Sequence, residues 1–379
     1  MAQTPIKPIE AKKYVIPRYA VDHLLESFQI VRTELSELLD IPDTNQADWS
    51  RYAEQWWNKQ SDEDQLILRK IITAMGSPVL VTNLTVMHGN EGLINSRAVF
   101  TSTRLEDPAF MIGMDEKGEN YNVSYVDSGS EILATLIVYL DASADFGVTE
   151  FGVTLTLNEL ITYIGLMDLY RRNYYISMLE HSREDFRVTY DDIWKAVDDG
   201  MRYPDLRWAL PFVLPSLIHM TQPPTQDQVN TAVQSLAKKG IIQWKQQEEA
   251  FDLTDPGLFA AMTLLKVYNK VNLVSLGFDE NGKRASKGAI FIRTDPILWT
   301  ILFDGAQARF SSIELDPAVD IVKEILTPTI VPAKRSAAKA PVPKAAGDVP
   351  TCPKCGKPAT WIDAYKRWYC YSCQEYLPQ

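Results

Sequence analysis

Residues 286–303 read SKGAIFIRTDPILWTILF, and residues 96–114 read SRAVFTSTRLEDPAFMIGM. Both stretches place an apolar run before an Asp-Pro pair and a second apolar run after it. Short apolar runs of this kind are typical of buried strands, and the Asp-Pro pair marks a turn between them. The two stretches therefore predict the same pair of sheet strands at two places in the chain.

The similarity extends on both sides of these stretches. Residues 61–140 and residues 254–326 both predict a helix, four strands and a helix, in that order. The first segment has expected helices over 62–75 and 132–140, and strands over 79–87, 96–102, 109–114 and 122–126. The second has expected helices over 255–267 and 318–325, and strands over 271–278, 288–293, 297–303 and 308–315. The fold class is therefore α+β, with two pseudo-repeated α-β-β-β-β-α halves; chance similarity between two α+β stretches is the alternative.

Helices dominate before and between the two segments. An apolar stripe at i, i+3 and i+4 spacing predicts a helix over residues 21–38. Capping boxes predict three further helix starts, because an acid or amide follows three positions after Thr156, Thr189 and Thr225. We expect the first of these helices to be long and to run past Tyr170.

Residues 224–253 fit a winged helix, as the capped helix precedes two apolar runs and a polar wing at 245–250. A DNA reader of this kind would project Arg and Lys from the helix. This helix instead carries Gln226, Asp227, Gln228, Asn230, Thr231 and Gln234. Lys238 and Lys239 come only in the last turn, where the helix dipole accounts for them. We interpret the segment as a scaffold, with a DNA reader as the alternative.

Charge is unevenly spread along the 379 residues. The chain has 38 Lys and Arg against 49 Asp and Glu, a net charge of −11, which argues against a protein that coats nucleic acid. Residues 327–379, which we call the tail, hold eight basic and three acidic residues. Residues 1–326, which we call the body, therefore carry a net charge of −16. No apolar run is long enough for a membrane helix, and the N-terminal stretch lacks the core of a signal peptide. We expect a cytoplasmic protein with no membrane insertion.

All four cysteines lie in the tail, at Cys352, Cys355, Cys370 and Cys373, with the spacing C-x2-C-x14-C-x2-C. This spacing predicts one structural Zn²⁺ bound by four thiolates in a zinc ribbon, with Gly356 free to take a positive φ. Two disulfides or a redox C-x-x-C pair are the alternatives; disulfides are disfavoured because nothing marks the chain as secreted. Four thiolates fill the tetrahedron, so we expect this zinc to be structural.

The stretch between body and tail, PTIVPAKRSAAKAPVPKAAGDVP, is rich in Pro, Ala and Lys and predicts a solvated linker. The expected domains are a first α+β half (15–150), a helical segment with the second half (151–326), a flexible linker (327–350) and the zinc ribbon (351–379). Between the cysteine pairs, residues 361–365 and 368–369 predict a hairpin of two short strands with its turn near Lys366 and Arg367, and aromatic residues flank this turn. They could stack on bases or pack the hairpin, so nucleic acid is a possible partner of the basic tail and not an expected one of the acidic body.

Known catalytic patterns are missing from the sequence. His23, His88, His181 and His219 are dispersed, without metal-ligand spacing or a cysteine neighbour. The sequence contains no glycine-rich phosphate loop and no G-x-S-x-G nucleophile motif. We expect a binding protein that is not an enzyme.

The order of elements is similar to that of the EspG-type chaperones of type VII secretion. The resemblance covers about residues 15–326, is one of pattern and carries no catalytic residues. It rests on the segments LAKKGII (236–242), DPGLFAAMTLL (255–265), VNLVSLGF (271–278), GAIFIRT (288–294), ILWTILFDG (297–305) and IELDPAVDIVKEIL (313–326). It implies that the body binds a helical secretion substrate and keeps the apolar tip of that substrate soluble. The linker, the ribbon and the Trp56-Trp57 pair depart from the family and put the partner in doubt.

Two functions follow from the sequence. The favoured one is a non-enzymatic adaptor or chaperone for a helical protein partner, with the zinc ribbon serving a second interaction. The alternative is a DNA-binding transcriptional regulator that uses the winged helix and the ribbon.

Overall fold

The computed structural model describes residues 12–36, 46–88, 92–102, 104–140, 147–182, 187–217, 220, 222–279, 282–295, 297–327, 351–356, 360–362, 367–370, 373 and 375–377. Contacts divide the chain into two units, Met1–Val331 and Pro332–Gln379. Almost all of the predicted linker lies outside the described residues, as do His219 and the side chains of most tail aromatics.

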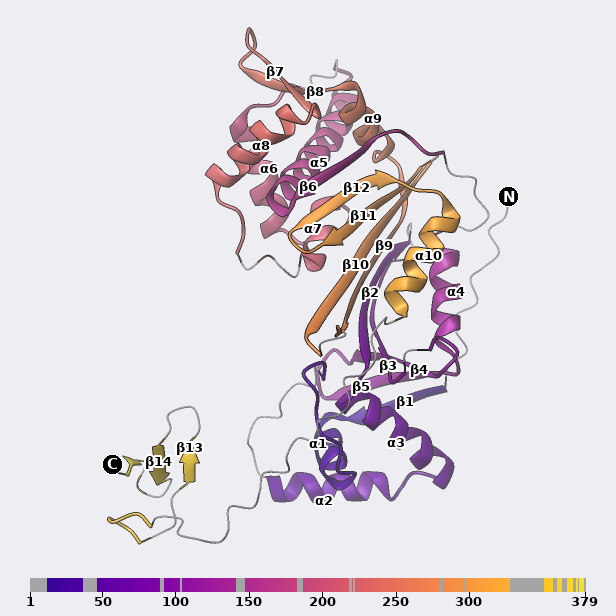
Figure 1. Ribbon diagram of the computed structural model, residues 1–379, viewed down its shortest axis with the longest axis vertical. Coiled ribbons are helices and arrows are strands. Elements are labelled where there is room, and N and C mark those ends of the chain that lie inside the picture. The colour runs from indigo at the N-terminus through magenta and orange to yellow at the C-terminus, as the bar shows by residue number, and fades with distance from the viewer. Residues whose placement is uncertain are drawn as a thin grey trace. The chain divides into compact units, whose positions relative to one another are not determined.

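A ten-stranded antiparallel sheet forms the centre of the first unit (Figure 1). Its strand order is β1-β5-β4-β3-β2-β9-β10-β11-β12-β6. The strands are β1 (Lys12–Pro17), β2 (Leu80–His88), β3 (Gly92–Phe100), β4 (Ala109–Met114), β5 (Asn120–Val126), β6 (Gly152–Thr156), β9 (Val267–Phe278), β10 (Arg284–Thr294), β11 (Leu298–Asp304) and β12 (Gln307–Ser312). The α+β class predicted from the sequence is confirmed.

The elements on the two sides of the β2–β9 pair follow one another in the same order. Each side begins with an edge strand, β1 or β6, passes through helices and returns as a four-stranded meander. Each side then ends in a helix, α4 (Gly129–Tyr139) or α10 (Leu315–Leu326). The predicted order of helix, four strands and helix is therefore present on both sides, and each side adds an edge strand that was not predicted.

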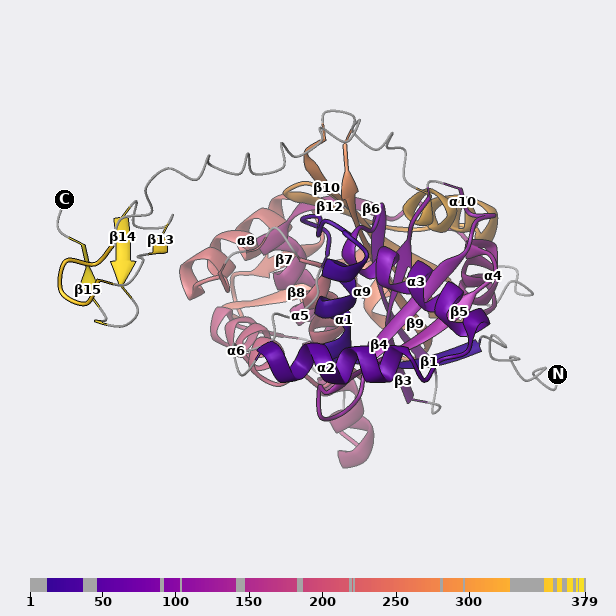
Figure 2. The ribbon, with the colours of Figure 1, turned by 90° about the horizontal axis from the view of Figure 1, so that it is seen from below.

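Helices cover both faces of the sheet, and a separate hydrophobic core lies on each face. Successive side chains of one strand point to opposite faces and therefore enter different cores. Along β2, Leu80 and Leu84 pack with α4 and α10 on one face, whereas Val81 packs with helices on the opposite face. Figure 1 and Figure 2 both show α4 and α10 close together beside the strands. On the opposite face, α1 (Arg18–Ser27), α2 (Gln46–Trp57) and α3 (Asp62–Gly76) cover the β1–β5 side.

A helical insertion covers the same face over the second half of the sheet. It consists of α5 (Leu157–Glu180), α6 (Tyr190–Arg202), α7 (Ala209–Val213), the 3-10 helix η1 (Leu214–Ser216), α8 (Gln226–Lys238), the hairpin β7 (Ile242–Lys245) and β8 (Ala250–Leu253), and α9 (Asp255–Thr263). The predicted capping boxes are confirmed at Thr156, Thr189 and Thr225. In each box, the threonine oxygen accepts from the third helical N–H, so the sequence locates these helix starts correctly.

The helix predicted over residues 21–38 is shorter than expected and ends at Ser27. The N–H groups of Gln29 and Ile30 donate to the carbonyl oxygens of Glu26 and Leu25, at 3.0 and 2.8 Å. Gln29 has a φ of 56°, and this left-handed residue terminates the helix. The apolar stripe misleads because Leu35 joins the same core as Leu24 and Leu25 although it lies beyond the end of the helix; residues 37 and 38 lie outside the described residues.

The helix predicted over residues 255–267 also ends early, at Thr263, because Val267 already begins strand β9. In the second unit, the strands are β13 (Thr360–Ile362), β14 (Arg367–Cys370) and β15 (Glu375–Tyr376), which form an antiparallel sheet. The first two correspond to the hairpin expected between the cysteine pairs.

Candidate functional site

Three of the four tail cysteines lie close together. The Sγ atoms of Cys352, Cys355 and Cys373 all lie within 4.8 Å of one another, and those of Cys352 and Cys373 are 3.8 Å apart. The N–H of Gly356 donates to the carbonyl oxygen of Cys352 at 2.8 Å, and Gly356 has a φ of +70°. Gly356 therefore takes the positive φ that the sequence allows, in a tight turn that holds Cys352 and Cys355 near each other.

This arrangement fits a metal ion. Two thiolates on a tetrahedral zinc, with Zn–S bonds of about 2.3 Å, lie roughly 3.8 Å apart, which is the separation of Cys352 and Cys373. Cys370 is on strand β14, and its side chain lies outside the described residues. The three thiols could thus hold a metal, with Cys370 the predicted fourth ligand.

The last two turns of α5 carry an exposed apolar strip. The helix is largely buried up to Arg171, whereas Tyr175, Ile176 and Leu179 are 40%, 44% and 81% exposed. Tyr175 and Ile176 precede Leu179 by four and three positions, the two spacings that place side chains next to each other on a helix. We call Tyr175, Ile176 and Leu179 the α5 strip; it is apolar surface that the fold itself leaves uncovered.

Helix α9 also carries exposed apolar side chains. Phe259 and Met262, one turn apart, are 44% and 50% exposed. Helix α9 packs on α5, and the hydroxyl of Tyr175 donates to the carbonyl oxygen of Leu265 at 2.5 Å. We call the α5 strip together with Phe259 and Met262 the α5/α9 surface.

A buried polar cluster fixes the middle of α5 to the start of α7. The carboxylate of Asp168 accepts hydrogen bonds from the N–H groups of Ala209 and Leu210, at 3.0 and 2.8 Å, and pairs with Arg171 at 3.1 Å. Burial raises the pKa of Asp168, while the charge of Arg171 and the two amides oppose this shift. Asp168 therefore serves as an internal anchor for the segment that enters α7.

Lys270 holds the loop before α7 against strand β9. Its side chain is buried, and Nζ donates to the carbonyl oxygens of Leu206 and Trp208. It also lies 4.8 Å from the centroid of the Phe212 ring. Burial lowers the pKa of Lys270 to about 7, and the charge of Arg171 acts in the same direction. The loop is thus held by a lysine that titrates near neutral pH.

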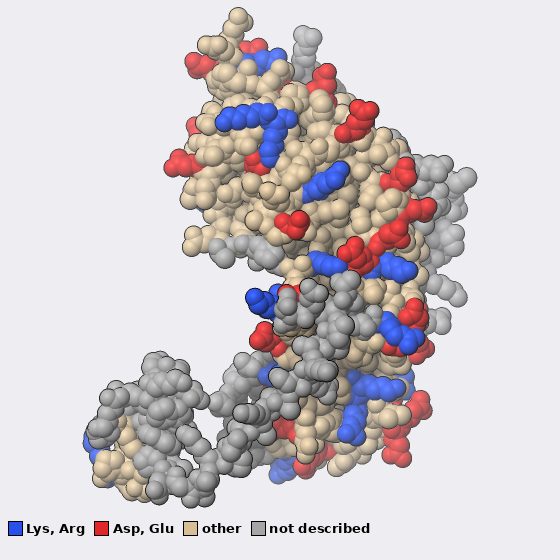
Figure 3. All heavy atoms as spheres, in the orientation of Figure 1, with Lys and Arg blue, Asp and Glu red and all other residues tan. Residues whose placement is uncertain are grey.

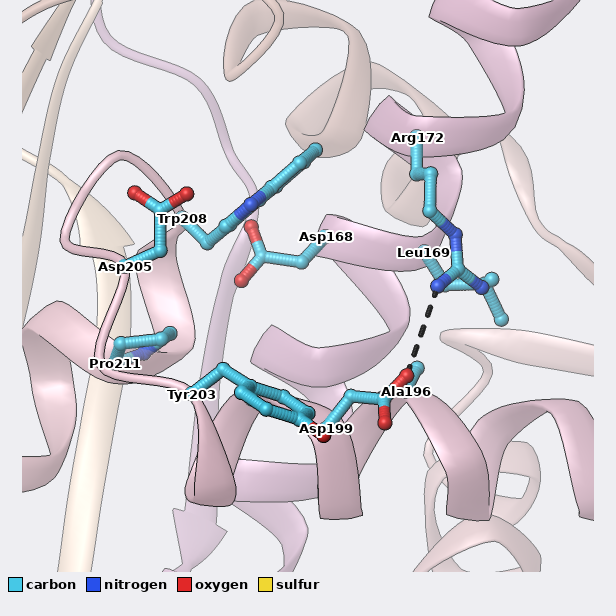
Figure 4. A pocket seen from close by; sticks show the side chains of 10 residues that line it. Asp168, Leu169, Arg172, Ala196, Asp199, Tyr203, Asp205, Trp208 and Pro211 are labelled. Atoms are coloured by element: carbon cyan, nitrogen blue, oxygen red, sulfur yellow. Dashed lines mark ion pairs between the residues drawn. The ribbon is translucent and has the colours of Figure 1, made fainter.

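A cavity of about 260 Å³ opens between α5, α6 and this loop (Figure 4). It is lined by Asp168, Leu169, Arg172, Ala196, Asp199, Gly200, Tyr203, Asp205, Trp208 and Pro211. Figure 4 shows Asp168, Trp208 and Tyr203 around a common space, with the ion pair of Arg172 and Asp199 to one side. The lining combines aromatic and aliphatic walls with a few charged groups, as ligand cavities do.

The predicted winged-helix segment has the expected order of helix α8 followed by the β7–β8 hairpin. The apolar residues Val229, Val233 and Leu236 of α8 are buried. The Nζ atom of Lys239 donates to Glu159 and to the carbonyl oxygen of Thr154, both at 2.8 Å. The Lys239 ammonium is therefore bound by the carboxylate of Glu159, an ion pair that was not predicted from the sequence.

The charge distribution gives no sign of a nucleic-acid surface on the face seen in Figure 3. Lys, Arg, Asp and Glu are scattered over that face, and neither sign gathers into one patch. The exposed side of α8 carries amides, hydroxyls and Asp227, with Lys238 at its end. These features favour a scaffold role for the segment.

The histidines lie on different elements. Nε2 of His23 is 3.3 Å from Ser27 Oγ, Nδ1 of His88 is 2.5 Å from Asn269 Oδ1, and His181 caps the end of α5. Among the described residues, the tail cysteines are the one group of three or more Cys, His, Asp or Glu placed to share a metal. Within those residues, no helix combines the length and the apolar character that a membrane span requires.

Comparison with known proteins finds a similarity at the level of structure. No protein-family model and no curated protein matches the chain. Among solved structures, the chain is similar to the type VII secretion chaperone EspG5 of Mycobacterium tuberculosis, determined in complex with a PE25–PPE41 dimer. The two chains are 11% identical with a TM-score of 0.39, over 84% of this chain and 98% of that one.

Proposed function

We propose that the chain is a non-enzymatic adaptor or chaperone that binds an amphipathic helix of a protein partner, such as a type VII secretion substrate, on the α5/α9 surface. The observation that carries the proposal is the exposed α5 strip, where Ile176 and Leu179 lie on the outside of a helix whose earlier turns are buried. An exposed helical strip of this kind matches the i, i+3 and i+4 anchors of a partner helix.

The size of the surface suits reversible capture. Full burial of a large apolar side chain contributes roughly 1.5–3 kcal/mol, and the five residues of the α5/α9 surface are about half exposed. Their burial would contribute on the order of 5 kcal/mol, which corresponds to a dissociation constant near the millimolar range before other contacts are added. Tighter capture therefore requires a further anchor beside the surface.

We further propose that Cys352, Cys355, Cys370 and Cys373 bind one structural Zn²⁺, so that residues 351–379 form a zinc ribbon for a second interaction. The proximity of three thiols and the positive φ of Gly356 support this proposal. The four-domain division and the flexible linker over 327–350 remain predictions, as does the cytoplasmic location. The shared element order on the two sides of the β2–β9 pair supports the interpretation of the halves as pseudo-repeats.

The alternative, a DNA-binding regulator, has less support. Lys239 is engaged by Glu159, and the exposed side of α8 is polar with an aspartate. A body with a net charge of −16 repels the phosphate backbone. Any nucleic-acid affinity should therefore depend on the basic tail and fall steeply with salt.

The test is capture of the partner from the native host with the full-length chain. Ile176→Glu combined with Leu179→Glu should reduce recovery of the partner at least tenfold, because a charge replaces each apolar contact. The matched control is Leu66→Glu on α3, which is 61% exposed but lies on the other half of the sheet. Unchanged recovery with the double variant, or recovery of nucleic acid alone, would reject the proposal.

A further inference from the structure

The cavity beside the loop that precedes α7 lies on the same side of α5 as the α5 strip. Leu169 and Arg172 line the cavity, and Ile176 and Leu179 follow Arg172 at i+4 and i+7. Toward the start of α5, this side packs against α6, where a Cβ added to Gly165 would lie 2.8 Å from Val197. Helix α6 ends at Arg202, so a partner helix lying on the α5 strip would meet the cavity at the point where α6 stops.

The charges around the cavity favour a neutral occupant. Each of its three carboxylates is already paired with an arginine. The pairs are Asp168 with Arg171 at 3.1 Å, Asp199 with Arg172 at 4.0 Å, and Asp205 with Arg207 at 2.7 Å. With every carboxylate of the lining paired in this way, the site has no surplus negative charge to bind a cation. An anion in the cavity would be repelled by the three carboxylates. A neutral side chain needs no unpaired carboxylate and meets no such repulsion.

The cavity also offers hydrogen-bonding capacity that is not used within the described structure. Oδ2 of Asp168 accepts from the N–H of Leu210 alone, and the Asp168 side chain keeps 12% of its surface exposed. In the described part of the chain, the indole N–H of Trp208 makes no hydrogen bond. A carboxylate oxygen accepts further hydrogen bonds, and an indole N–H only donates.

A phenol satisfies both groups at once. Its hydroxyl can donate to Asp168 and accept from Trp208, while its ring packs against the apolar walls formed by Leu169, Tyr203 and Pro211. We infer that this cavity binds a tyrosine side chain of the helical partner, as the anchor that strengthens capture on the α5 strip. This inference rests on the proposed function and names the chemistry of the partner at the same site.

The experiment measures the binding of p-cresol, used as a probe, to the full-length chain by ligand-observed NMR. Toluene has the same methyl-substituted ring without the hydroxyl. Benzylammonium has a phenyl ring with a cationic aminomethyl group and no hydroxyl. We expect p-cresol to bind at least fivefold more tightly than either probe. Ala196→Leu, which extends a side chain into the cavity from α6, should abolish p-cresol binding, whereas Leu66→Glu should leave it unchanged. Equal binding of toluene, a preference for benzylammonium, or unchanged p-cresol binding by Ala196→Leu would overturn the inference.

Partner capture separates this inference from the proposed function. Ala196→Leu should weaken capture of the partner about tenfold, as should changing the anchoring tyrosine of the partner to phenylalanine. Loss of capture by the α5 strip variant with no effect of Ala196→Leu would refute the anchor and leave the proposed function intact. Binding of p-cresol together with undiminished capture by the strip variant would refute the proposed function instead.

Discussion

Oγ1 of Thr82 and Oγ of Ser275 lie 2.6 Å apart, fully buried, although 193 positions separate them in the chain. They face each other across β2 and β9, the strands that join the two sides of the sheet. Their neighbours on the same face are aliphatic side chains under α4 and α10. A hydroxyl pair in such surroundings is favourable only while both partners are present, because either one alone would be an unsatisfied polar group.

A double-mutant cycle tests this pair. Thr82→Val and Ser275→Ala should each lower the free energy of unfolding by about 1–3 kcal/mol, since each leaves one buried hydroxyl without its partner. The double variant should cost less than the sum of the two, by roughly 1 kcal/mol or more. Urea unfolding measures all four proteins; strictly additive costs would show that the two hydroxyls do not depend on each other.

The metal proposal predicts about one zinc per chain and its loss on removal of a buried thiol. Cys352→Ser should reduce the zinc content of the purified protein below half an equivalent, because the remaining thiols cannot complete the tetrahedron. The melting temperature of the first unit should stay within about 1 °C, since the tail is a separate unit. Wild-type protein that is purified under reducing conditions and carries no zinc would contradict the proposal.

Lys270 predicts a specific pH dependence of stability. Its pKa falls from 10.5 in the unfolded chain to about 7 in the folded one. Below pH 7 both states hold the proton, and the full cost of burying the ammonium is present. Between pH 7 and 10 the unfolded chain alone binds the proton, so stability rises with pH by up to about 1.4 kcal/mol per unit.

The comparison with Lys270→Met isolates this contribution, because methionine does not titrate. The free energy of unfolding of the wild type relative to the variant should increase by about 1–3 kcal/mol from pH 7 to pH 9. Denaturant unfolding at pH 7, 8 and 9 measures the difference. Parallel pH profiles for the two proteins would show that the lysine stays protonated in the folded chain.

Gly165→Ala should destabilise the protein although it lies within helix α5. At an open helical site this change stabilises by about 1 kcal/mol. Here the new Cβ would lie 2.8 Å from Cγ2 of Val197, so overpacking should cost roughly 1–3 kcal/mol and reverse the sign. Gln234→Ala, on the exposed side of α8, is a control that should change stability by less than about 0.5 kcal/mol. A gain in stability from Gly165→Ala would mean that α5 and α6 are less tightly packed than described.

Local chemistry made much of the fold predictable. The capping boxes at Thr156, Thr189 and Thr225 depend on residues three positions apart, and each helix begins where the sequence predicts. The meander strands were also found, because their apolar runs are bounded by turns. The edge strands β1 and β6 were missed, since they are short and their pairing with β5 and β12 depends on residues far away in the sequence.

The candidate site was predictable only in part. The cysteine spacing indicates the tail cluster directly, whereas the sequence does not identify the docking residues of the body. The cavity was not predicted, because Asp168, Trp208 and Lys270 come from a helix, a loop and a strand that meet only in the folded chain. A single lysine within an apolar strand was the one local sign of a buried polar cluster.

The contact between Lys239 and Thr154 bears on how the protein behaves at high concentration. Thr154 belongs to β6, the last strand of the sheet, and its carbonyl oxygen is occupied by the lysine ammonium. A strand from another molecule that approached this edge would have to displace a charged group and leave it, together with Glu159, without its partner. The lysine thus opposes edge-to-edge aggregation through β6.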